Sequence, residues 1–228
     1  MTDHVLDGAP PVPLLMRRSA RARRISLRVS QLDGRVTLTL PGHVPEAEAL
    51  DFARSKEAWI RQNLAGLPAE GRVAIGAHVP IEGALLKVVH GAGRRVVLTA
   101  DQVLVPGDPK RAGVRLAIHL KQLARDRLAQ ASDHYAAQLG KTYSRLTIRD
   151  TRSRWGSCTS AGGLMYSWRL ILAPSEVLRY VAAHEVAHLA EMNHSPAFWH
   201  QVARIHGPYE TERNWLRTQG AGLHRIVF

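Results

Sequence analysis

Two histidines four residues apart, with a glutamate between them, form the segment His184-Glu185-Val186-Ala187-His188. Residues i and i+4 of a helix lie one turn apart on the same face, so both imidazoles can bind one ion. Zinc accepts imidazole nitrogen at about 2.0–2.1 Å. Glu185 would then stand beside the ion, where a carboxylate can take a proton from zinc-bound water. The segment therefore predicts metal-assisted hydrolysis.

A catalytic zinc site needs a third protein ligand and one position left open for water. We predict that His194 is this ligand. Asn193 tolerates the left-handed conformation that ends a helix, and the chain could turn back there. Ser195 and Pro196 resemble the cap and the first residue of a new helix, which we expect over 196–206. Both features favour a bend at His194.

Glu191 and His200 are the alternatives for the third ligand. Glu191 lies seven residues beyond His184. On a continuous helix this is a rise of about 10.5 Å, too far for three ligands to converge on one ion. Glu191 also occupies the glycine position of the pattern H-E-x-x-H-x-x-G-x-x-H, which the three histidines otherwise match. His200 lies inside the next expected helix and is the reserve ligand.

Three more residues have types that can take part in chemistry. Cys158 is the only cysteine, which excludes an intramolecular disulfide and a cysteine-rich zinc site. We interpret it as a small buried residue, because the histidine motif leaves no need for a thiol nucleophile. Tyr209 and His206 follow the third histidine, where an oxyanion donor could stand, yet each is more often structural. The oxyanion-stabilising residue stays unassigned.

The histidine motif requires a helix that faces the core. Residues 175–192 contain no glycine or proline, and Pro174 fits a first helical turn, so a helix of about five turns is expected. Val177 and Val181 share one stripe with both histidines, which places the imidazoles toward the interior.

Other elements around this helix follow from the apolar pattern. A long helix over 110–139, ended by Gly140, should pack beside it. Strands are expected over 144–149 and 164–172, on either side of a turn at 159–163.

The sequence of the N-terminal part predicts a β-rich unit. Residues 24–40 alternate apolar and polar types on both sides of Asp33-Gly34, which predicts a hairpin. Residues 45–66 are expected to form a helix in which Trp59 is a large anchor. Short strands are expected to complete this unit over 72–75, 84–89, 94–98 and 102–105.

We expect an α+β fold of two parts. Proline and glycine at 105–109 interrupt both helix and strand and mark the boundary. The parts are then an N-terminal β-rich unit with one helix, residues 1–106, and a catalytic unit with a small sheet, residues 107–228.

Composition narrows the class of protein. The chain has 228 residues, 45% of them hydrophobic, which is enough to bury a core. No apolar run approaches the roughly 20 residues that a membrane span requires. The start of the chain lacks a secretory pattern and there is one cysteine, so we expect a cytoplasmic protein. The net charge of +12 and the arginines between 17 and 28 raise nucleic acid as a partner, though a solvated surface explains them equally.

Two segments, RWGSCTSAGGLMYSWRLILAP and YVAAHEVAHLAEMNHSPAFW, resemble the YgjP-like family of predicted zinc metallopeptidases, which is related to the SprT-like and WLM groups. The arginine-rich start RRSARARRISLRV adds to the resemblance. It implies a zincin-like catalytic half with Glu185 as the catalytic residue and Zn²⁺ on three ligands, His184, His188 and His194. It also implies a peptide or protein substrate, which could add as a strand beside residues 154–157 or 164–168.

The leading hypothesis is therefore a zinc metallopeptidase, a metal-dependent hydrolase in which Glu185 activates water. One alternative is a basic nucleic-acid-associated protein whose zinc site is structural or acts on bound proteins. Binding to DNA or RNA that weakens steeply with salt would identify it. Another is a metal-dependent amidase that acts on small molecules. Cleavage of small amides but not of casein or a peptide library would identify it.

Overall fold

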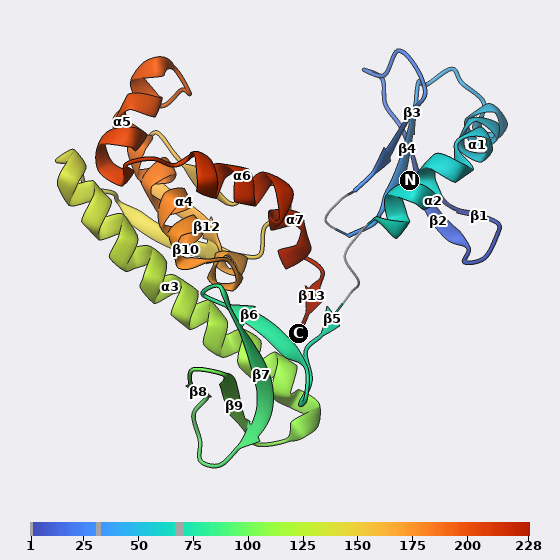
Figure 1. Cartoon of the computed structure of the whole chain (residues 1–228). Coiled ribbons are helices and arrows are strands. Elements are labelled where there is room, and N and C mark those ends of the chain that lie inside the picture. Colours follow the sequence, from blue (N-terminus) through green and yellow to red (C-terminus); the bar gives the residue numbers. More distant parts are fainter. Residues whose placement is uncertain (1, 31–32, 67–70) are drawn as a thin grey trace. The chain divides into compact units, whose positions relative to one another are not determined.

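The structure is a computed structural model that describes residues 2–30, 33–66 and 71–228. The chain divides into two compact units, residues 1–69 and 70–228, both drawn in Figure 1. The described residues combine seven α-helices with several small sheets, a mixed α/β architecture. No helix in these residues is both long and apolar enough to cross a membrane.

The first unit contains a four-stranded sheet. Its strands, in the order in which they pair, are β1 (Thr2–Leu6), β2 (Val12–Arg18), β4 (Val36–Leu40) and β3 (Ser26–Val29). β2 and β4 run parallel, and the other neighbours are antiparallel. β3 and β4 form the hairpin that the alternation over 24–40 predicted, and Gly34 adopts a φ of 67° in its turn.

Two helices, rather than one, follow this sheet. α1 (Glu46–Ser55) and α2 (Glu57–Ala65) are separated at Lys56. Ile60 is fully buried in the core of the unit, whereas the neighbouring Trp59 is 44% exposed. The expectation that Trp59 is an anchor is therefore wrong: consecutive helical residues point about 100° apart, and Ile60 takes the inward position.

The second unit is built along one long helix, α3 (Ala112–Leu139), which ends at Gly140 as predicted, with a φ of 66°. A four-stranded sheet lies at its N-terminal half (Figure 1). The strands pair in the order β6 (His78–Ile81), β7 (Ala84–Gly91), β9 (Gln102–Pro106) and β8 (Val97–Leu98). A short pair, β5 (Gly71–Arg72) with β13 (Ile226–Val227), joins the two ends of this unit.

The β6–β9 sheet belongs to the second unit, although we expected residues 1–106 to form the first. Val103 and Val105 share one apolar cluster with Leu116 and Leu120 of α3. The segment that follows β9 is a tight turn: Asp108 accepts a hydrogen bond from the backbone N–H of Lys110 at 3.0 Å, and the 3-10 turn η1 (Pro109–Arg111) leads into α3. Proline and glycine here reverse the chain and do not separate two units.

The remaining elements surround the C-terminal half of α3. A three-stranded sheet has the order β10 (Arg145–Arg149), β12 (Gly163–Ser167) and β11 (Gly156–Cys158). The strand expected over 164–172 ends at Ser167, because the buried 3-10 segment η2 (Trp168–Leu172) follows. The helices are α4 (Ser175–Ala187), α5 (Pro196–His206), α6 (Glu210–Thr218) and α7 (Gly220–Leu223).

Fragments test this division. Residues 70–228 produced alone should unfold in one cooperative thermal transition, followed by circular dichroism, because they contain the whole α3 cluster. Residues 107–228 should lose that transition, since removing the sheet exposes the apolar face of α3 that it covers. A 107–228 fragment that melts as cooperatively as 70–228 would place the boundary near residue 106 instead.

Candidate metal centre

The histidine pair lies at the C-terminal end of α4. The helix is buried on most sides, with Val177 and Val181 each less than 5% exposed. It ends at Ala187, so the expected continuation to residue 192 and stop at Asn193 are wrong. Leu189 and Ala190 donate their backbone N–H groups three residues back, at 2.9 and 3.0 Å, and such bonds tighten and end a helix.

The chain then turns back, as the position of His194 required. Asn193 acts through its side chain, not through a left-handed backbone: its Oδ1 accepts a hydrogen bond from the N–H of Ser195 at 3.1 Å. Ser195 caps α5 by accepting from the N–H of Phe198 at 3.5 Å, and α5 covers the 196–206 that we expected.

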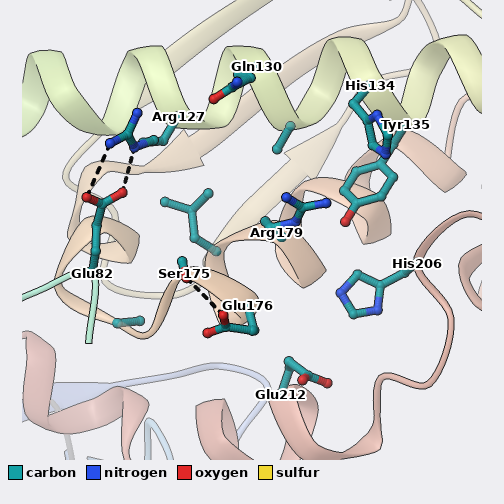
Figure 2. Close-up of a pocket in the computed structure, with 13 residues that line it drawn as sticks. Glu82, Arg127, Gln130, His134, Tyr135, Ser175, Glu176, Arg179, His206 and Glu212 are labelled. Carbon is teal, nitrogen blue, oxygen red and sulfur yellow. Dashed lines mark hydrogen bonds and ion pairs between the residues drawn. The ribbon is translucent and has the colours of Figure 1, made fainter. Parts of the chain in front are cut away.

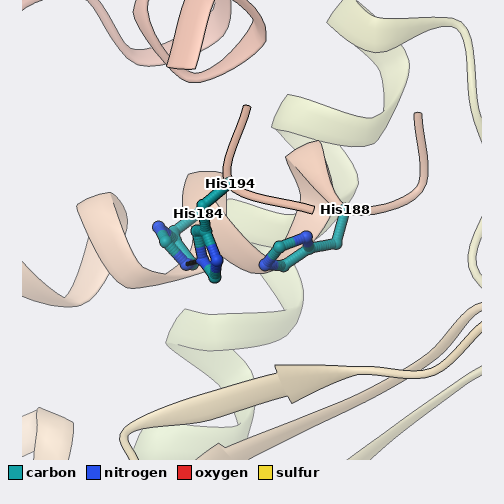
Figure 3. Close-up of side chains that lie close together, drawn as sticks. All are labelled: His184, His188 and His194. Carbon is teal, nitrogen blue, oxygen red and sulfur yellow. Dashed lines mark hydrogen bonds between the residues drawn. The ribbon is translucent and has the colours of Figure 1, made fainter. Parts of the chain in front are cut away.

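Figure 3 shows the three imidazoles facing one another. One nitrogen from each of His184, His188 and His194 lies within 4.8 Å of the others. The Nε2 atoms of His184 and His194 are 3.1 Å apart. Two nitrogens on a tetrahedral zinc ion lie about 3.3 Å apart, given bonds of about 2.0–2.1 Å. The spacing therefore suits donors that share one ion.

An aromatic ring holds the three imidazoles in place. Phe198 is fully buried, stacks on His188 with ring centroids 4.4 Å apart, and meets His184 and His194 edge-on at 4.9 and 4.8 Å. Because Phe198 lies in the first turn of α5, the cap at Ser195 positions the ring and the loop together.

The protein environment keeps two of these histidines neutral. Burial lowers the pKa of His184 to about 3, helped by the charges that His188 and His194 would carry. Burial also lowers the pKa of His188, against the effect of its hydrogen bond to the carbonyl of Glu191. In that bond Nδ1 of His188 lies 3.0 Å from the oxygen. A neutral His188 that donates there carries its free lone pair on Nε2.

Glu185 is held between α4 and the edge strand β11. Its side chain is 6% exposed. A Cβ atom added at Gly156 of β11 would lie 2.5 Å from Oε1 of Glu185, so only glycine permits this approach. Burial raises the pKa of Glu185 from 4.5 to about 8, and the positive charge of Arg154 opposes the rise. The carboxylate is thus a stronger base than an ordinary glutamate.

An open pocket of about 420 Å³ leads to these groups. Arg154, Cys158 and Met192 line it beside Glu185 and the histidines. Burial, with the charge of Glu185, raises the pKa of the Cys158 thiol to about 11. The thiol therefore stays protonated near neutral pH, which a nucleophile would not. Cys158 is only half-buried, however, and not the buried residue that we expected.

The other residues singled out from the sequence lie elsewhere. In the described parts of the chain, the group that can hold a metal contains neither Glu191 nor His200. Glu191 contributes its backbone carbonyl rather than its carboxylate. Tyr209 stacks between Tyr180 and Trp199, with centroids 5.9 and 5.3 Å away.

A second pocket, of about 720 Å³, lies between α3 and the N-terminal part of α4 (Figure 2). Arg127 donates to Glu82 at 2.6 Å on its rim, and Arg179 points toward the ring of Tyr135. His206 lines this pocket, and its Nδ1 lies 3.1 Å from the carbonyl of Pro208. No three metal-ligating groups converge here among the described residues.

The sequence indicated residues 154–157 only as a docking strand; it missed Phe198, the contact of Gly156 with Glu185 and the place of Arg154 in the pocket. A glycine in a strand does signal the close approach of another group, so Gly156 could have been found. Phe198 looks like any apolar helix residue, and Arg154 like any exposed arginine.

Comparisons with known proteins give a family match and one similar solved structure. Residues 23–219 match the sequence model described as YgjP-like, metallopeptidase domain. One solved structure, the metallopeptidase zymogen of Pyrococcus abyssi abylysin, aligns with 44% of this chain and 99% of its own length, at 19% identity and a TM-score of 0.36. No curated protein matches the chain.

The buried carboxyl predicts how the metal-free protein responds to pH. The folded state holds the Glu185 proton up to about pH 8, whereas the unfolded state releases it near 4.5. Stability from this group is therefore present at low pH and is lost as the pH rises through that window, by up to about 1.4 kcal/mol per pH unit.

Glu185→Gln removes this dependence. In urea unfolding with a chelator, the variant should gain stability over the wild type between pH 5 and pH 8. Stability curves that run parallel across this range would show that the carboxyl titrates normally.

Proposed function

The chain belongs to the YgjP-like metallopeptidase family, and on that premise we propose that it cleaves peptide bonds as a zinc-dependent hydrolase. The observation that carries the proposal is the convergence of His184, His188 and His194 beside the buried Glu185 of α4. Zinc binding by His184, His188 and His194, catalysis by Glu185 and a zincin-like unit are all part of the proposal.

The donor set fits zinc. All three side chains offer imidazole nitrogen, and a catalytic zinc site takes three protein ligands with one open position. The carbonyl of Glu191 orients His188, as outer hydrogen bonds commonly orient metal-binding histidines. A bound zinc ion would polarise the substrate carbonyl and make the attacking water easier to deprotonate.

Glu185 supplies the proton transfers. It lies at the pocket next to the histidines, in position to take the proton of the attacking water. The same carboxyl can then give that proton to the leaving amine nitrogen. Contact with Gly156 prevents the side chain from swinging toward β11, so its carboxylate stays aimed at the pocket.

The substrate can pair with the free edge of β11. β12 has β10 and β11 on its two sides, which removes residues 164–168 as a docking edge. Trp155 accepts from Ser167 at 2.8 Å and Thr159 donates to Gly163 at 3.0 Å, toward β12. By alternation, the peptide groups of Gly156 and Cys158 face away from β12, where an extended peptide can bond to them.

Two further expectations stay predictions. The single cysteine favours the cytoplasm, and the basic composition allows binding to nucleic acid.

His194→Ala should remove zinc from the protein. Loss of a hydrogen-bond partner of a metal ligand lowers metal affinity by roughly 10–100-fold. Loss of the ligand itself should lower zinc affinity by more than this. Metal content after dialysis, read by mass spectrometry, should fall well below one ion per chain. The matched control is His200→Ala in α5, which should keep its zinc; the reverse result would make His200 the third ligand.

Glu185→Gln should retain zinc but lose hydrolysis. Removing a general base lowers kcat by about 10²–10⁴-fold. The assay is cleavage of casein and of a peptide library, with Glu191→Gln as a control that keeps activity. Turnover within a few-fold of the wild type would remove Glu185 from the mechanism, and activity confined to small amides would make the protein an amidase.

A further inference from the structure

Arg154 is a cation at the mouth of the pocket with unused donors. It lines the pocket together with Glu185 and the histidines. Its side chain is exposed and makes no hydrogen bond or ion pair with any residue that the structure describes. Two other arginines of this unit form salt bridges with carboxylates: Arg127 with Glu82 at 2.6 Å and Arg169 with Asp150 at 2.7 Å.

Contacts hold the backbone at Arg154 and at the residue that follows it. Its carbonyl accepts a hydrogen bond from Thr151 at 2.8 Å. The next residue, Trp155, packs on the ring of His224 with centroids 4.9 Å apart and lies against Gly220. The guanidinium therefore projects from a backbone that these contacts hold in place, two residues before β11 begins.

The position of Arg154 relative to the reacting bond follows from β11. Gly156 touches the carboxyl of Glu185, so the bond that is attacked must lie near Gly156. Arg154 stands two residues earlier. Arg154 precedes β11 and follows no strand geometry, but it lines the same pocket as Gly156 and Glu185. A peptide on this edge rises about 3.3 Å per residue, so a residue about two positions from the scissile bond comes beside Arg154.

We propose that Arg154 selects substrates with an acidic side chain about two residues from the bond that is cleaved. The planar guanidinium presents paired donors that match a carboxylate, and it stays charged at any working pH. The inference rests on the proposed function, because it takes the peptide along β11. The same chemistry could bind the α-carboxylate at the C-terminus of a peptide.

Matched peptides test the preference. One series carries Glu, Gln or Lys at each position within three residues of the cleaved bond, and all its members are amidated at the C-terminus. Zinc-loaded wild-type protein should cleave the best Glu peptide with a kcat/KM about tenfold above its Gln partner, as a charge-assisted bond allows. A neutral series with a free C-terminal carboxylate tells the two carboxylate sources apart.

Charge reversal at two matched positions gives the control. Arg154→Glu should invert the preference toward the Lys peptide, and Arg154→Lys should keep part of the Glu preference. Arg149→Glu makes the same change in β10, in register with Ser167 and two strands from β11, and should leave the preference unchanged. Equal cleavage of Glu and Gln peptides by the wild type, or an equal effect of both reversals, overturns the proposal.

A binding experiment tests the role of Arg154 independently of peptide cleavage. Zinc-loaded Glu185→Gln protein is titrated with fluorescent Glu and Gln peptides, with and without the Arg154→Glu change. Tighter binding of the Glu peptide that depends on Arg154 supports the inference even if no peptide is cleaved. Equal binding of both peptides overturns it, even if the wild-type protein proves to be a peptidase.

Discussion

The close approach of His184 and His194 is the constraint on which the rest of the site depends. Their Nε2 atoms lie 3.1 Å apart although ten residues separate them. α4 must end at Ala187, the loop must turn back, and Ser195 must start α5 at once. Phe198 packs against all three imidazoles, so one buried ring connects the helix end, the loop and the three histidines.

A second close approach lies between Glu185 of α4 and Gly156 of β11. Because Gly156 has no side chain, β11 can lie directly against the carboxyl of Glu185. The same strand is the open edge of its sheet and begins two residues after Arg154. The proposed general base Glu185, the proposed docking edge and the side chain of Arg154 thus meet around one three-residue strand.

The sequence predicted those features that depend on local spacing. The i, i+4 histidines, the cap at Ser195 and the glycine stop of α3 all appear where expected. It did not predict the end of α4, because hydrogen bonds three residues back, not a left-handed Asn193, decide it. The division at residue 69 depends on the packing of Val103 and its neighbours on α3, which no local pattern reveals. Gly156 and Arg154 likewise acquire their roles only when β11 meets α4.

A crystal structure of the zinc-loaded protein, with anomalous scattering recorded at the zinc edge, would show which side chains hold the ion. We predict one anomalous peak about 2.0–2.1 Å from a nitrogen of each of His184, His188 and His194, with no other protein ligand. A peak bound to Glu191 or His200 in place of His194, or no peak between the three imidazoles, would contradict it.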